Sequence, residues 1–449
     1  MHYQRFVSEG LAHFSYLVGD GGRAVVIDPR RDIEAYVAAA LDAGLEIQFV
    51  LETHRNEDIV VGSAALAERT GAAVWHADAH LPYQYGEAVQ DGQTWSLGSL
   101  TVEAMHTPGH TPGSMSYVLR ASGGAPWMVF SGDLLFAGDV GRVDLAGHDA
   151  IAKMAGLLYD SLTQRVLPLG DGVLLRPAHG AGSACGATLA DRDHTTIGLE
   201  RALNPQLQID SREAFVAAVS RELPFPPYFK SVERQNLRGA TERAAPLGPV
   251  SLDDIDGAGA TVVDLRHELG FAGAHIPGAL SLPPGAAGRF GGWVLDPEEE
   301  VVLTGPGAPE VARLLDRMGY SRVLGELADG IDAYLRAGRE PAGVRTISVQ
   351  GLCRALDAGN DVWLFDVRSD EERAASAIPN AHGIDLRYLA DQSDAIPQDR
   401  DVYLFCGSGR RAMVGAARLQ HLGGFANLVV VLGGFAGWQA RSCPIQRAR

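Results

Sequence analysis

The chain has 449 residues, more than one hydrophobic core usually serves, so two to four domains are expected. Hydrophobic residues make up 46% and charged residues 21%, which is ordinary for a soluble globular protein. The formal net charge of −17 argues against binding to a nucleic-acid backbone or to an anionic membrane surface.

The sequence predicts a cytoplasmic protein without a membrane anchor. Its first residues, MHYQRFVSEG, lack the apolar core of a secretory signal, and no later apolar run approaches the length of a membrane span. Four cysteines are too few and too scattered for a disulfide framework: Cys185, Cys353, Cys406 and Cys443. The sequence leaves the oligomeric state open and is compatible with a homodimer or a higher homo-oligomer.

Predicted strands and helices alternate over the first 190 residues. Residues 24–28 and 47–51 are typical of strands, and residues 63–70 of a short helix. Asp32 is placed to cap an intervening helix, because apolar side chains recur at helical spacing from Ile33 onward.

Four polar motifs each follow an apolar, strand-like run. They are THRNEDIV (53–60), HTPGHTPGS (106–114), SGD (131–133) and PAHG (177–180). Polar groups placed just past strand ends can gather ligands on one rim of a sandwich. This pattern resembles the metallo-β-lactamase superfamily over about the first half of the chain, and the resemblance implies an N-terminal αββα sandwich.

The resemblance also indicates which metal ligands are present. A dinuclear zinc member would show HxHxDH in the first motif, but Asn56 and Ile59 stand where two of those histidines would be. The set that remains is His54, His110 and Asp133. Two imidazoles and one carboxylate suit a single non-haem Fe(II) per chain, with zinc as the alternative. Asp58 and His179 are then expected to orient ligands or a bound water.

Further motifs resemble the iron-dependent persulfide dioxygenases, which keep this His, His, Asp set. They are DPRRDI (28–33), GRVDLAG (141–147) and PAHGAGSACG (177–186), whereas Asn56 departs from the usual histidine of that family. The resemblance implies oxidation by O2 of a small persulfide, such as glutathione persulfide, to sulfite and free thiol. Arg142 either binds a substrate carboxylate or pairs with Asp144 to support its own loop.

The second half of the chain repeats itself. VVDLR (262–266) returns as LFDVR (364–368), and IPGA (276–279) returns as IPNA (378–381). This offset predicts two tandem α/β domains with central parallel sheets. The expected division is 1–243, 244–345 and 346–449.

The last predicted domain contains CGSGRR (406–411) between an apolar run and a helix-like stretch. The motif resembles the active loop of rhodaneses, which implies that Cys406 is a nucleophile and persulfide carrier. Backbone N–H groups of Gly407, Ser408 and Gly409 would hold thiosulfate or sulfite, whose charge Arg411 and Arg410 would neutralise. The middle domain has Gly305 and Glu310 at the positions of Cys406 and Arg411, so we expect it to be a catalytically silent rhodanese-like domain.

Two other functions fit parts of the sequence. One is a zinc-dependent thioester hydrolase of the glyoxalase II kind with a rhodanese tail, although the loss of two zinc-ligand histidines argues against it. The other is a sulfur-carrier protein whose metal site is degenerate and whose chemistry is at Cys406.

Overall fold

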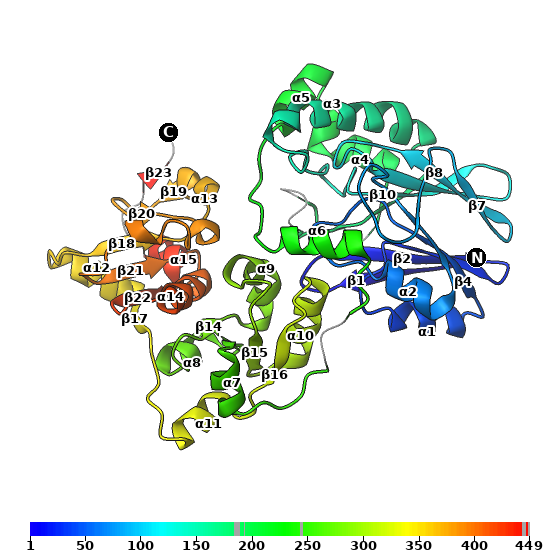
Figure 1. Ribbon diagram of the computed structural model, residues 1–449. Helices are drawn as coiled ribbons and strands as arrows, with labels where there is room; N and C mark the ends of the chain where they lie inside the picture. The colour runs from blue at the N-terminus through cyan, green and yellow to red at the C-terminus, as the bar shows by residue number, and fades with distance from the viewer. Residues whose placement is uncertain (184–188, 193, 243–245, 442–445, 448–449) are drawn as a thin grey trace. The chain divides into compact units, whose positions relative to one another are not determined.

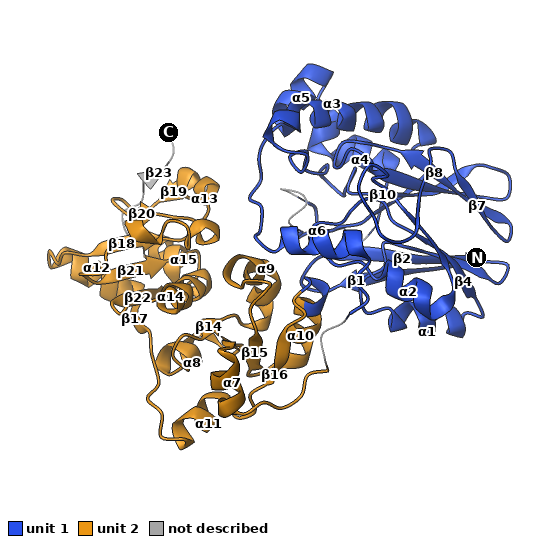
Figure 2. Cartoon of the chain, viewed as in Figure 1, with its two compact units in different colours: residues 1–243, 316–319 blue, residues 244–315, 320–449 orange. Residues whose placement is uncertain are grey.

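The computed structural model describes residues 1–449 except 184–188, 193, 243–245, 442–445 and 448–449. The chain divides into two compact units (Figure 2): one comprises Met1–Arg243 with Asp316–Gly319, and the other Ala244–Leu315 with Tyr320–Arg449. Cys185 and Cys443 lie outside the described residues, as does the expected domain boundary at 243/244.

The first unit contains two six-stranded sheets. The first sheet has the order β1-β2-β3-β4-β5-β6 and the second the order β12-β11-β10-β9-β8-β7. The strands of the first are β1 (His2–Ser8), β2 (His13–Asp20), β3 (Arg23–Ile27), β4 (Glu46–Leu51), β5 (Ala73–His76) and β6 (Glu87–Ala88). Those of the second are β7 (Thr94–Leu97), β8 (Leu100–His106), β9 (Met115–Arg120), β10 (Pro126–Gly132), β11 (Leu174–Pro177) and β12 (Thr195–Thr196).

The helices of this unit are α1 (Glu34–Asp42), α2 (Ser63–Thr70), α3 (Ile151–Ser161), α4 (Ile197–Leu203), α5 (Arg212–Val219) and α6 (Phe229–Arg238). Short helical turns are η1 (His148–Ala150), η2 (Leu162–Val166), η3 (Leu167–Leu169) and η4 (Pro205–Gln208). No helix in the described part of the chain is long and apolar enough to cross a bilayer.

Alternation along the strands produces four layers, because successive side chains of a strand point to opposite faces of its sheet. In β2, Tyr16 packs between the two sheets, whereas the adjacent Leu17 packs against Tyr36 of α1. On the outer face of the second sheet, strand residues such as Val129 pack against Leu158 of α3. The layers are therefore helix, sheet, sheet, helix (Figure 1).

The strands and the helix predicted for this unit agree closely with those in the structure, but one predicted helix cap does not. The strands expected at 24–28 and 47–51 are β3 and β4, each shifted by no more than one residue, and the helix expected at 63–70 is α2. The prediction that Asp32 caps α1 was wrong. The helix starts at Glu34 without a side-chain cap, and the Asp32 carboxylate instead forms an ion pair with Arg30 at 2.9 Å.

The second unit contains two fully parallel sheets and one small antiparallel pair. The four-stranded sheet, ordered β14-β13-β15-β16, consists of β13 (Thr261–Asp264), β14 (Leu280–Ser281), β15 (Val301–Thr304) and β16 (Val323–Glu326). The five-stranded sheet, ordered β17-β22-β21-β18-β20, consists of β17 (Arg345–Ser348), β18 (Trp363–Asp366), β20 (His382–Gly383), β21 (Val402–Phe405) and β22 (Leu428–Leu432). The antiparallel pair is β19 (Ser376–Ala377) with β23 (Gln446–Arg447).

The helices of the second unit are α7 (Leu252–Ala258), α8 (Glu268–Gly273), α9 (Pro284–Val294), α10 (Ala308–Arg317), α11 (Gly330–Arg336), α12 (Val349–Asp357), α13 (Asp370–Ala375), α14 (Arg410–Leu422) and α15 (Gly434–Ala440). Two short turns are η5 (Leu386–Tyr388) and η6 (Ser393–Ala395). The C-terminal part of α10 falls in the first unit.

The sequence repeat corresponds to a structural repeat. The first VVDLR-type segment forms β13, which pairs in parallel with β15, and its second copy forms β18, which pairs in parallel with β21. Two residues after each of these strands, an arginine turns back and its guanidinium donates two hydrogen bonds to the aspartate that ends the strand. These arginine forks join Arg266 to Asp264, with an Nη2–Oδ2 distance of 2.6 Å, and Arg368 to Asp366, with an Nη2–Oδ2 distance of 2.7 Å.

Candidate metal centre and thiol loop

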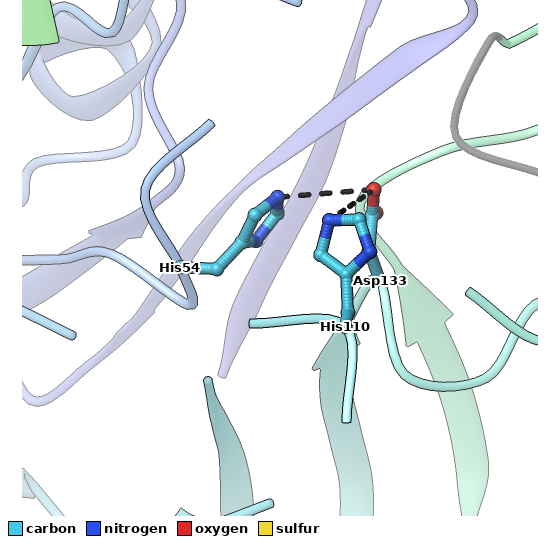
Figure 3. Close-up of side chains that lie close together, drawn as sticks. All are labelled: His54, His110 and Asp133. Atoms are coloured by element: carbon cyan, nitrogen blue, oxygen red, sulfur yellow. Dashed lines mark ion pairs between the residues drawn. The ribbon is translucent and has the colours of Figure 1, made fainter. Parts of the chain in front are cut away.

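Three buried side chains of the first unit, His54, His110 and Asp133, lie close together (Figure 3). His54 follows β4, His110 lies in the loop between β8 and β9, and Asp133 directly follows β10. The Nε2 atoms of His54 and His110 lie 3.7 and 3.6 Å from Asp133 Oδ2. Each residue is at most 2% exposed. The sequence motifs therefore bring their ligand-type side chains to one place.

Hydrogen bonds on the far side of each ring orient both imidazoles. The Thr53 hydroxyl donates to Asp28 at 2.8 Å and therefore accepts from Nδ1–H of His54, also at 2.8 Å. Nδ1–H of His110 donates to the carbonyl of Arg142 at 3.0 Å. Neither Nε2 has a hydrogen-bond partner among the described residues. Two buried Nε2 atoms without a hydrogen-bond partner, beside a carboxylate, are suited to bind a divalent metal ion.

His179 lies between two carboxylates. Its Nδ1 is 2.8 Å from Asp133 Oδ1 and its Nε2 is 3.0 Å from Asp58 Oδ2. Burial opposes the ionisation of Asp133, but the neighbouring His179 and His54 hold its pKa below the usual range. Both ring nitrogens of His179 therefore face carboxylates, with Asp133 between His179 and the two other histidines.

Glu57 is a buried acidic residue of the first motif that sequence reasoning did not select. Its Oε1 lies 3.3 Å from His110 Nε2, and the residue is fully buried. Burial opposes a charged carboxylate here, but the interaction with His110 lowers the pKa of Glu57 and raises that of His110. The only sequence signal was an acidic residue inside a motif of metal-ligand type.

The two residues that replace zinc-ligand histidines are also buried. The Asn56 amide folds back and donates to the carbonyl of His54 at 3.4 Å. Ile59 is 1% exposed, as expected for an apolar side chain that packs against its own domain. Neither residue offers a second imidazole to the first motif.

Asp78 joins the first two motifs and was not predicted. Its carboxylate accepts hydrogen bonds from the backbone N–H of Arg55 at 2.9 Å and from the Thr111 hydroxyl and the Gly113 N–H at 2.8 Å each. The loops that carry His54 and His110 are therefore tied to one carboxylate. A polar residue just after β5 was the signal that could have found it.

Asn236 of α6 holds the first motif from the other side. Its amide donates to the carbonyls of Asn56 and Ile59, both at 2.8 Å, and its oxygen accepts from the N–H of Val61 at 2.9 Å. The Tyr228 hydroxyl, just before α6, donates to the carbonyl of Asp58 at 3.0 Å. The loop is thus clamped by a segment far away in sequence.

Arg142 is engaged within its own domain. Its guanidinium makes two hydrogen bonds to Asp144, at 2.7 and 2.8 Å, and donates to the carbonyls of Leu223 and Pro224. The side chain is 1% exposed. This is the loop-supporting arrangement, and the role of Arg142 in substrate binding stays a prediction.

Cys406 lies at the end of β21, at the start of a tight loop that leads into α14. Its Sγ accepts a hydrogen bond from the N–H of Gly409 at 3.1 Å, and the residue is 1% exposed. The N–H of Phe435 donates to the Cys406 carbonyl at 2.7 Å. A Cβ at Gly434 would collide with that carbonyl, and its φ of +50° also favours glycine.

The two arginines of this loop differ in their surroundings. Arg411 makes a two-fold ion pair with Glu372, at 2.6 Å for each hydrogen bond. Arg410 is 74% exposed and lies 3.7 Å from Glu268. The charge of Arg411 is therefore already balanced by a neighbouring carboxylate.

Comparison with known proteins identifies a domain in each half of the chain. Residues 9–179 match the model of the metallo-beta-lactamase superfamily, and residues 348–441 match that of the rhodanese-like domain. The human mitochondrial persulfide dioxygenase ETHE1 is 29% identical over 50% of this chain and 83% of its own length. The hydroxyacylglutathione hydrolase GloC of Haemophilus influenzae is 27% identical over 44% of this chain and 93% of its own length.

A crystal structure of a metallo-beta-lactamase from Staphylococcus aureus has a TM-score of 0.66 and 28% identity to this chain. The match covers 73% of this chain and 98% of that one, so it extends beyond the first unit. The four-layered first unit has the metallo-β-lactamase fold, and the β/α repeat of the second unit ends in the rhodanese-like fold. The chain therefore contains a metallo-beta-lactamase domain with persulfide dioxygenases among its homologues, followed by a C-terminal rhodanese-like domain.

Proposed function

We propose that this chain is an iron-dependent persulfide dioxygenase with a sulfurtransferase domain. One small persulfide, such as glutathione persulfide, one O2 and one water would give the free thiol and sulfite. The homology to persulfide dioxygenases and the rhodanese-like domain support persulfide oxidation and sulfur transfer in general. The identity of the metal and of the thiol belongs to the proposal.

The observation that carries the proposal is the donor set at the metal position. It consists of two imidazoles and one carboxylate, buried and adjacent, without the two further histidines that a zinc pair needs. Such a set leaves several coordination positions open, which suits Fe(II) that must accept O2 and a substrate sulfur together. His54, His110 and Asp133 would hold one Fe(II) per chain, which would supply the activation of O2.

The surrounding residues have defined tasks in this proposal. Thr53 and the Arg142 carbonyl keep both imidazoles in the tautomer whose Nε2 faces the metal. His179 holds Asp133 by a hydrogen bond from Nδ1, and Asp58 lies 3.0 Å from the other ring nitrogen of His179. The burial of the whole set keeps bulk water from the reacting sulfur.

Cys406 would exchange sulfane sulfur between the persulfide pool and thiosulfate or sulfite. Its position at a strand end, with the N–H of Gly409 directed at Sγ, supports a thiolate that accepts and releases sulfur. The loop backbone at Gly407 and Ser408 would bind the anionic sulfur compound. Arg411 is tied to Glu372, which leaves the exposed Arg410 as the more accessible cation.

Residues 244–345 would then be a silent rhodanese-like domain. The repeated β-strand pairs and the repeated arginine forks support a duplication. Gly305 stands where the second copy has Cys406, so this domain has no thiol at that position to carry sulfur.

The test is the metal content of anaerobically purified protein together with O2 uptake on addition of glutathione persulfide. We expect about one iron per chain and stoichiometric formation of sulfite, both lost in His110→Ala. His148→Ala is the control, because that exposed ring pairs with Glu222 on the surface and should leave both readouts unchanged. Iron-loaded protein that consumes no O2 with any small persulfide would overturn the proposal.

The hydrolase GloC favours one alternative, the hydrolysis of a thioester by zinc-activated water. This alternative predicts bound zinc and cleavage of a hydroxyacylglutathione thioester in the absence of O2. A chain that binds no metal but transfers sulfur from thiosulfate would instead be a sulfur carrier with Cys406 as its reactive group.

A further inference from the structure

Glu57 lies at the metal-facing side of His110, where the proposed function has no task for it. Its Oε1 is 3.3 Å from His110 Nε2, closer than Asp133 Oδ2, which is 3.6 Å from the same atom. Two donor atoms bound at about 2.1 Å to one ion and roughly at right angles lie about 3 Å apart. The Glu57–His110 separation is therefore close to that of two neighbouring ligands.

Asn56 stands where a dinuclear zinc member would have a histidine ligand, so the first motif offers one imidazole donor fewer. A histidine at that position would supply an imidazole, but the Asn56 amide turns back to the carbonyl of His54. Glu57, the next residue, is held in the same clamped loop, because Asn236 binds the carbonyls on both sides of it. The first motif thus has a buried carboxylate directed at His110 where an imidazole is missing.

The charge of Glu57 is a second reason to expect a metal ion beside it. Glu57 is fully buried, and a buried carboxylate needs a cation nearby. A metal ion bound at His110 Nε2 would place positive charge beside the atom that the Glu57 carboxylate already faces. A divalent ion with Asp133 and Glu57 would also be neutral as a set, which lowers the cost of burying it.

We propose that Glu57 is a fourth protein ligand of the metal, replacing the histidine for which Asn56 stands. The inference deepens the proposed function and rests on its metal site. Glu57 is not one of the three residues whose donor atoms all lie within 4.8 Å of one another. Coordination therefore includes a rotation of its side chain toward the ion, which its three rotatable bonds permit.

The test measures metal affinity under argon, without persulfide or O2, by competition with a chromophoric chelator for Fe(II) and Co(II). We expect Glu57→Gln to weaken binding at least tenfold, because the amide is a much poorer ligand than the carboxylate. The visible absorption of the Co(II) protein should also change, since it reports coordination number and ligand type. A dissociation constant within twofold of the unaltered protein would overturn the proposal.

Two further variants make the result specific. Glu52→Gln is the matched control: Glu52 is equally buried in this unit, and its carboxyl group accepts from the Tyr85 hydroxyl at 2.6 Å instead of facing the metal position. It should leave metal affinity unchanged. Glu57→Asp keeps the charge but shortens the arm, so a ligand role predicts weakening similar to that in Glu57→Gln. Full affinity in Glu57→Asp would mean that Glu57 acts through charge alone, and it would overturn ligation.

The experiment also distinguishes the loss of a metal ligand from misfolding of the variant and from failure of the proposed dioxygenase function. Circular dichroism of each metal-free variant shows whether it folds, and if Glu57→Gln does not, Glu57→Asp decides the outcome. A failure of the proposed dioxygenase function appears as absent O2 uptake in the unaltered protein. That result would leave the affinity difference between Glu57→Gln and Glu52→Gln fully interpretable.

Discussion

Nδ1 of His54 and Nδ1 of His110 face away from the metal position, and each donates a hydrogen bond to one acceptor. One acceptor is a side chain and the other is a backbone carbonyl. His110 uses the backbone carbonyl of Arg142, which no substitution removes. His54 uses the side chain of Thr53, whose hydroxyl is itself held by Asp28. Burial raises the pKa of Asp28 to about 6, so this carboxyl group remains mostly charged at neutral pH. The His54 side of the site is therefore open to a mutational test.

We predict that Thr53→Val weakens metal binding by about ten- to a hundredfold. Valine has nearly the same shape but leaves Nδ1–H of His54 without its acceptor, so the ring is no longer held in the metal-binding tautomer. Chelator competition measures the effect. Thr53→Ser restores the hydroxyl and should recover most of the affinity.

Thr107→Val is the control for Thr53→Val. Thr107 is also fully buried, but its hydroxyl bonds to Ser116 at 2.9 Å, whereas the rings of His54 and His110 bond to Thr53 and to the Arg142 carbonyl. If both valine variants weaken metal binding equally, the hydroxyl of Thr53 has no special role in orienting His54.

The candidate metal ligands could be predicted from sequence because both their residue types and their positions after strand-like runs are distinctive. His54, His110 and Asp133 each follow an apolar run, so their convergence could be expected before the structure was known. The positions of Glu57 and Asp28 depend on which way their side chains face inside a loop. A sequence carries no period from which that direction could be predicted.

Among the helices, α6 has the clearest effect on the site although it contributes no ligand. Asn236 satisfies three backbone groups of the first motif, which lie as many as 180 residues away in sequence. The loop cannot satisfy these groups by regular secondary structure. The helix therefore acts as a clamp on the loop that carries His54.

We predict that Asn236→Ala lowers the free energy of unfolding of the first unit by about 2 to 4 kcal/mol, because buried backbone groups lose their partners. Metal affinity should fall as well, since the loop that carries His54 is released. Urea titration followed by circular dichroism gives the first quantity and chelator competition the second.

Arg238→Ala, on the same helix, is the comparison for Asn236→Ala. Arg238 is exposed and pairs only at the surface with Glu242, so its loss should cost less than about 0.5 kcal/mol. An Asn236→Ala variant as stable as Arg238→Ala would show that the clamp contributes nothing.

Elements were easier to predict than the contacts between them. Apolar runs placed β3, β4 and α2 to within one residue, because period and turn residues are local signals. The expected cap at Asp32 failed because its carboxylate pairs with Arg317, 285 residues away in sequence, as well as with Arg30, so a tertiary contact overrides a local preference. The clamp by Asn236 is a contact of the same long-range kind and had no local signal.

At the scale of the whole molecule, the two kinds of chemistry belong to different parts of the chain. The candidate metal ligands come from the first unit, and the thiol loop comes from the second. The repeat in the second unit was predictable from sequence because the same strand segments recur at one offset. A functional link between the metal position and the thiol loop was not predictable in this way, because each sequence motif describes only its own site.

We predict that the two activities separate cleanly. Cys406→Ser should abolish sulfur transfer from thiosulfate to cyanide, because the hydroxyl is too weak a nucleophile to carry sulfane sulfur, and it should leave O2 uptake with a persulfide unchanged. His110→Ala should do the reverse and lower O2 uptake on the order of a hundredfold or more. Both assays are run on the full-length chain.

A third assay of the same variants shows whether the sites cooperate. With thiosulfate and a small thiol as the only sulfur sources, Cys406 must first form the persulfide that the metal site oxidises, so O2 uptake should require both residues. A mixture of the Cys406→Ser and His110→Ala proteins should recover this uptake, because the small persulfide diffuses between chains. If Cys406→Ser alone consumes O2 from thiosulfate at the full rate, sulfur transfer at Cys406 does not supply the oxidation.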